Sequence, residues 1–114
     1  MLDAQALAGL MTLDPTGANR LVQRVLSTYQ VSLGKLLRQM GDGRERGDNA
    51  AIRLAAHTLK SSSASIGALE LSRLCSAVET AVREGQQDAV PTLVDQLQAE
   101  AGRVDLAVQE FLSR

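Results

Sequence analysis

Apolar residues recur at three- and four-residue steps along most of the chain, and this spacing predicts α-helices. Five helices are expected, at about residues 3–13, 18–40, 48–66, 68–84 and 88–112. The first is short, whereas the other four are long, amphipathic and joined by short loops. Long amphipathic helices with short connections bury their apolar stripes against one another. The pattern therefore predicts an all-α fold, an up-and-down four-helix bundle with a short additional N-terminal helix.

Glycine, proline and capping residues suggest where these helices end. The segment 14–17 holds proline and glycine and predicts a turn, and the polar, glycine-rich segment 41–47 predicts a loop whose charges are solvated. Asp48 or Asn49 is a suitable N-cap for the helix that follows. Gly67 is a natural left-handed terminus for the end of that helix.

The size and composition agree with one helical domain over residues 1–114. The hydrophobic fraction is 45%, enough to bury a core without disulfides or a structural metal. Aromatic residues make up only 2%, which favours helices, because strands are enriched in aromatic and β-branched residues. Cys75 is the only cysteine and lies on an apolar stripe, so a core thiol is expected there.

The charge pattern excludes several classes of partner. The 12 basic and 13 acidic side chains are mixed along the chain, with no basic stripe to bind nucleic acid. No apolar run approaches the ~20 residues that span a bilayer, so no direct membrane insertion is expected. No signal-peptide pattern precedes the first predicted helix, which favours a cytoplasmic location. Because the bundle can bury its stripes alone, a monomer is expected.

The single histidine, His57, lies on the outer face of its predicted helix. Successive helical residues turn by about 100°, so placing Ile52, Ala56 and Leu59 toward the core turns His57 outward. Lys60 falls on the flank between this outer face and the core. One histidine and one cysteine have no ligand spacing, so no metal site is predicted.

The neighbours of His57 on this face are small or modestly apolar: Leu54, Ser61 and Ala64. A solvated helix face would carry Glu, Lys and Gln instead, so these residues indicate a contact patch for a partner protein. Arg53 either contacts an acidic partner or is an ordinary surface residue. A lone helical histidine is most often a surface residue, and small residues often mark a close helix crossing. His57 combined with Lys60 and the small residues that follow is a more specific pattern than any one of these residues alone. The combination therefore favours a functional site.

The segment His57-Thr58-Leu59-Lys60-Ser61-Ser62-Ser63-Ala64-Ser65-Ile66-Gly67-Ala68 resembles the signature of histidine-containing phosphotransfer (HPt) domains of bacterial two-component phosphorelays. The shared elements are the histidine, an apolar residue at +2, lysine at +3, small residues at +4 to +6 and glycine at +10. The chain length, the five-helix pattern and the segment 71–79 are also similar to this family. One departure is Ser61, where the family most often has glycine.

The resemblance implies a role for each matching residue. His57 would accept a phosphoryl group on Nε2 from a receiver-domain aspartyl phosphate and pass it to another receiver. Lys60 would lie beside that group, and Gly67 would shape the helix end. Glu79, at +22, would bond the other ring nitrogen. The implied partners are response-regulator receiver domains and a hybrid histidine kinase.

Phosphoryl transfer depends mainly on positioning and charge stabilisation. Lys60 supplies a compact positive charge, but no carboxylate cluster offers a site for a divalent metal. We therefore expect no cofactor on this chain and Mg²⁺ on the partner receiver. No nucleotide-binding motif is present, so no ATP-dependent kinase activity is expected.

The sequence leaves two alternatives open. In the first, the domain is attached to a kinase and phosphorylated by the kinase core. In the second, it is a helical adaptor that binds a receiver without carrying phosphate. His57 and Lys60 argue against the adaptor, because binding alone requires no nucleophile.

Overall fold

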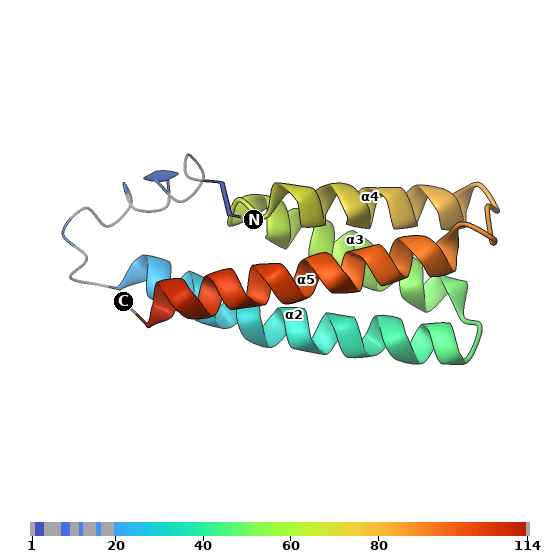
Figure 1. Ribbon diagram of the computed structural model, residues 1–114, viewed down its shortest axis with the longest axis horizontal. Coiled ribbons are helices and arrows are strands. Elements are labelled where there is room, and N and C mark those ends of the chain that lie inside the picture. The colour runs from blue at the N-terminus through green and yellow to red at the C-terminus, as the bar shows by residue number, and fades with distance from the viewer. Residues whose placement is uncertain (1, 4–7, 10–11, 13–15, 17–19, 114) are drawn as a thin grey trace.

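The computed structural model describes residues 2–3, 8–9, 12, 16 and 20–113 and contains four long helices (Figure 1). They are α2 (Leu21–Glu45), α3 (Asn49–Ser65), α4 (Leu69–Arg83) and α5 (Val90–Leu112). No strand occurs among the described residues. The predicted all-α fold is confirmed, whereas the short N-terminal helix expected at 3–13 lies mainly outside the described residues.

The four helices pack in a closed ring. The most extensive contact is between α3 and α4, followed by α2 with α3, α4 with α5, and α2 with α5. Helices that follow one another are joined by short turns and run in opposite directions, which is the up-and-down arrangement (Figure 1). Residue Asp3 lies beside the turn between α3 and α4, because its backbone N–H donates to the carbonyl of Gly67 at 2.6 Å.

Glycines in the left-handed conformation end three of the helices. Gly67 has φ 83° and follows α3, where its N–H donates to Ala64 O and the N–H of Ala68 donates to Ser63 O. This pair of bonds is the Schellman motif, which satisfies carbonyls left unpaired at the end of a helix. Gly47 and Gly85, with φ 67° and φ 70°, close α2 and α4 in the same way. At the other end of α3, the Asp48 side chain accepts from Ala51 N–H at 3.1 Å.

The predicted loop at 41–47 is wrong for residues 41–45, because α2 continues to Glu45, and only Arg46 and Gly47 form a turn. Gly43 is buried where the last turn of α2 meets the first turn of α3. A Cβ at Gly43 would lie 3.1 Å from Ala51 Cβ and 3.2 Å from the Asp48 carbonyl. The glycine therefore permits a close helix approach, and tertiary packing overrides its low helix propensity.

The charged residues of this segment are also not all in a loop. Arg44 lies in the last turn of α2 and pairs with Asp95 of α5. Both side chains are exposed, and an ion pair of this kind contributes little to stability. The pair nevertheless places the end of α2 beside the beginning of α5.

The two glycines in the last turns of α2 predict opposite effects of alanine. Gly41→Ala has open space around the new Cβ and should raise the free energy of unfolding by about 0.5–1 kcal/mol, because alanine favours the helix. Gly43→Ala should gain less or lose stability, because the backbone of Asp48 has little freedom to move away. Urea unfolding of the two variants measures the difference. Equal stabilisation by both would contradict the close approach at Gly43.

The core is apolar apart from a few polar groups, and Cys75 belongs to it. Cys75 is fully buried, and burial raises the pKa of its thiol to about 12, as expected for a core residue and not a redox site. Tyr29 of α2 is also buried, which raises its pKa to about 12. Its hydroxyl is 2.8 Å from the Ser63 hydroxyl of α3, so both groups have a hydrogen-bond partner.

Candidate functional site

The outward face of α3 carries the residues that the sequence singled out. The side chain of His57 is 60% exposed, and Leu54 is 63% exposed. Arg53, Ser61 and Ala64 are exposed on the same helix. The opposite face, with Ile52, Ala55, Ala56, Leu59 and Ser63, is buried in the bundle. The helical spacing predicted this division between faces.

The carboxylate of Glu79, on α4, contacts two polar residues of α3, His57 and Lys60. Glu79 Oε2 is 2.9 Å from His57 Nδ1, and Glu79 Oε1 is 2.7 Å from Lys60 Nζ. The Glu79 side chain is only 11% exposed, whereas that of Lys60 is 34% exposed. The close packing of α4 against α3 thus joins residues that are 22 positions apart in the sequence.

The negative charge of Glu79 is maintained by its two partners. Burial alone would raise its pKa, but the contacts with Lys60 and His57 outweigh burial and lower the pKa. Oε1 accepts no hydrogen bond of ordinary geometry among the described residues, so the Lys60 ion pair is its compensation. The carboxylate is therefore ionised, and the ammonium of Lys60 lies beside it as a counter-charge.

This arrangement selects one form of the imidazole. Because an ionised carboxylate accepts hydrogen bonds only, His57 Nδ1 must carry the proton and donate it. In the neutral ring the lone pair then lies on Nε2, on the exposed side of α3. The site can thus offer a nucleophilic nitrogen to a group that approaches from solvent.

The lowered pKa of Glu79 predicts a loss of stability in acid. A depressed folded-state pKa stabilises the fold above the unfolded value, near 4.5, and this contribution is lost as pH falls through the lower folded value. Urea unfolding of wild type should therefore show a larger drop between pH 7 and pH 3 than that of Glu79→Gln. Glu110→Gln, on the exposed side of α5, should keep the wild-type drop. A Glu79→Gln drop equal to that of wild type would contradict the ion pair.

Sequence reasoning missed the contact between Lys60 and Glu79. His57 and Lys60 are three residues apart and hence neighbours on a helix surface, so a carboxylate that reaches one can reach the other. That spacing was the available signal. Ser72 was also missed, although its hydroxyl donates to the Lys60 carbonyl at 3.0 Å. No pattern of spacing singles out Ser72 among the other serines.

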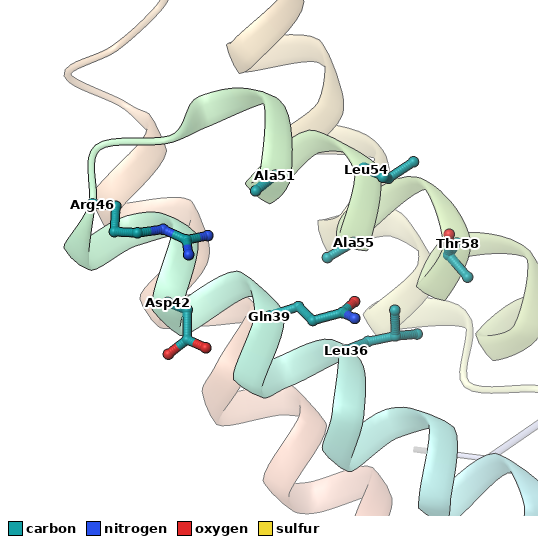
Figure 2. A pocket seen from close by; sticks show the side chains of 8 residues that line it. All are labelled: Leu36, Gln39, Asp42, Arg46, Ala51, Leu54, Ala55 and Thr58. Atoms are coloured by element: carbon teal, nitrogen blue, oxygen red, sulfur yellow. The ribbon is translucent and has the colours of Figure 1, made fainter.

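A shallow groove of about 450 Å³ lies between α2 and α3, beside the histidine face (Figure 2). Its lining residues are Leu36, Gln39, Asp42, Arg46, Ala51, Leu54, Ala55 and Thr58. Leu54, predicted to contact a partner, belongs to this lining, whereas Ser61 and Ala64 lie farther along α3. The predicted partner-binding residues therefore extend along α3 from the groove past His57.

Two further properties concern metals and membranes. Within the part of the chain that the structure describes, no three His, Cys, Asp or Glu side chains come together in a way that could hold a metal ion. Among the same residues, no helix has the length and apolar character needed to cross a bilayer.

A four-helix bundle with one exposed histidine, backed by a carboxylate from the next helix, defines a candidate histidine phosphotransfer protein. The family model for the Hpt domain matches residues 24–107, which is most of the chain. The chain therefore belongs to the Hpt domain family. Members of this family are phosphotransfer intermediates of phosphorelays, not kinases, and they interact with receiver domains and histidine kinases.

A solved structure supports the same assignment. The chain is similar to the crystal structure of histidine-containing phosphotransfer protein B (HptB) from Pseudomonas aeruginosa PAO1, with a TM-score of 0.89 and 26% sequence identity. The match covers 99% of this chain and 95% of HptB. Comparison with curated protein sequences gives no match.

Proposed function

We propose that this protein is a phosphorelay intermediate in which His57 accepts a phosphoryl group from a receiver-domain aspartyl phosphate and passes it to another receiver. The observation that carries the proposal is an imidazole that is 60% exposed and bonded at Nδ1 by a nearly buried carboxylate. A histidine that served only as a surface residue would have no need of a buried partner from another helix.

The transfer requires no proton movement on this chain. The Nε2 lone pair attacks phosphorus, the bond between phosphorus and the aspartyl oxygen breaks, and the aspartate leaves with the electron pair. The ring keeps its Nδ1 proton and becomes positively charged, and Glu79 stabilises that charge through the existing hydrogen bond. In the forwarding step, a second aspartate attacks phosphorus and the ring leaves as neutral imidazole.

Lys60 is proposed to stabilise the phosphoryl group. Its ammonium lies one turn from His57, and its side chain is partly exposed. Since phosphoryl transfer depends on positioning and charge stabilisation, a cation that Glu79 holds beside His57 lowers the barrier. Mg²⁺ is proposed to be held by the partner receiver, and this chain supplies no cofactor of its own.

The partners proposed are receiver domains and a hybrid histidine kinase, with Arg53, Leu54, Ser61 and Ala64 as contact residues. We further propose a cytoplasmic monomer that has no kinase activity, binds no nucleic acid and does not insert into a membrane. The mixed charges of the chain support the exclusion of nucleic acid.

The test is transfer of labelled phosphate from a phosphorylated receiver, followed by a chase with a second, unlabelled receiver. The proposal expects an adduct that is acid-labile and base-stable and that disappears during the chase. Labelling by a kinase core and ATP, with none from the receiver, would favour the kinase-attached substrate domain. Receiver binding without any labelling would favour the adaptor.

A further inference from the structure

The feature that leads beyond the proposed function is a hydrogen bond between α4 and the backbone of α3. Ser72 lies in the first turn of α4, half-buried, and its hydroxyl donates to the carbonyl of Lys60 at 3.0 Å. The Lys60 carbonyl lies inside α3 and not at its end. The serine therefore caps no helix end, and its bond links two helices at the level of the candidate site.

Ser72 and Glu79 act on the same partner from the same side. They are seven residues apart, two helical turns, and so lie on one face of α4. Ser72 bonds the backbone of Lys60, while Glu79 contacts the ammonium of Lys60 and the imidazole of His57. α4 thus contacts both the backbone carbonyl and the side-chain ammonium of Lys60.

The rest of the contact between α3 and α4 is less directional. The other residues that α4 buries are mainly apolar, among them Leu71, Leu74, Cys75 and Val78, and α3 buries small residues such as Ala56. Apolar contacts of this kind tolerate small sliding and rotation, whereas a hydrogen bond weakens steeply with distance and angle. A shift of α4 by a fraction of a turn would separate Glu79 Oε2 from His57 Nδ1.

We propose that Ser72 is a positioning residue for the phosphotransfer site, because its bond to the Lys60 backbone fixes the axial register of α4 and holds Glu79 opposite His57. The inference rests on the proposed function for its role in transfer. Its structural claim concerns only the hydrogen bond between Glu79 and His57. That claim can be measured without any phosphoryl donor.

The experiment uses imidazole ¹⁵N chemical shifts, which report the tautomer of His57 without assignment because the chain has one histidine. Ser72→Ala should raise the fraction of the Nε2–H tautomer by up to about fivefold, the factor that corresponds to one net hydrogen bond. Ser72→Thr keeps the hydroxyl and should restore the wild-type spectrum. Ser76→Ala, an exposed serine one turn later on α4, is the matched control and should leave the spectrum unchanged.

Urea unfolding of the same variants separates positioning from general stability. A wild-type tautomer ratio in Ser72→Ala, with or without a loss of stability, would overturn the proposal. An equal shift in Ser72→Ala and Ser76→Ala would also overturn it, since the effect would then not depend on the Lys60 bond. If Ser72→Ala shifts the tautomer but His57 takes no phosphate in wild type, the proposed function fails and the register claim stands.

Discussion

In the His57→Gln variant, the rate of phosphoryl transfer from a phosphorylated receiver to this protein should fall by at least about 10³-fold, because the nucleophile itself is absent. Glutamine has no ring nitrogen with a free lone pair. Its amide can still donate to Glu79, and the ion pair of Glu79 with Lys60 remains. The loss is therefore expected to be chemical and not a consequence of unfolding.

Circular dichroism and urea unfolding provide the control for this variant. His57 is exposed and the new amide can still donate to Glu79, so the change in stability should not exceed about 1.5 kcal/mol, the net contribution of one hydrogen bond. The urea unfolding curve should accordingly stay close to that of wild type. Labelling that persists in His57→Gln would show that another group accepts the phosphate.

Ala64→Trp is expected to slow transfer by about 10²-fold while the bundle stays folded. Ala64 is exposed, two turns from His57 on the same face of α3, so a bulky ring there meets the approaching receiver. A displacement of about 1 Å in the reacting groups is enough for a loss of this size. Ser61→Phe, one turn from His57, should act in the same way.

The matched control for Ala64→Trp is Ala99→Trp, which places the same ring on an exposed position of α5. The structure shows no extensive contact between α3 and α5, so transfer should proceed at the wild-type rate in this variant. Rates are measured by rapid quench with one phosphorylated receiver. Equal rates for Ala64→Trp and wild type would contradict docking along the small-residue face of α3.

The orientation of His57 could be predicted because it follows from helical periodicity alone. Ile52, Ala56 and Leu59 determine which side of α3 is buried, and His57 then has only one place to lie. The end of α3 could also be predicted, because a glycine readily adopts the left-handed conformation that ends a helix, as Gly67 does. Both features depend on residues close together in the sequence.

The end of α2 could not be predicted, because its cause lies in another helix. Gly41 and Gly43 indicate a loop by local propensity, whereas the close contact of Gly43 with Ala51 and the Asp48 backbone favours a continued helix. The ion pair between Lys60 and Glu79 could not be predicted for the same reason. It depends on the register between α3 and α4, which side chains such as Ser72 set across the contact.

The central claim is that Glu79 holds the proton on Nδ1 and leaves Nε2 as the nucleophile. NMR of the ¹⁵N-labelled, phosphorylated protein tests it directly, because coupling of phosphorus to a ring nitrogen identifies the modified atom and the chain has a single histidine. We expect coupling to Nε2 with a proton retained on Nδ1. Phosphate on Nδ1, where Glu79 is bonded, would contradict it.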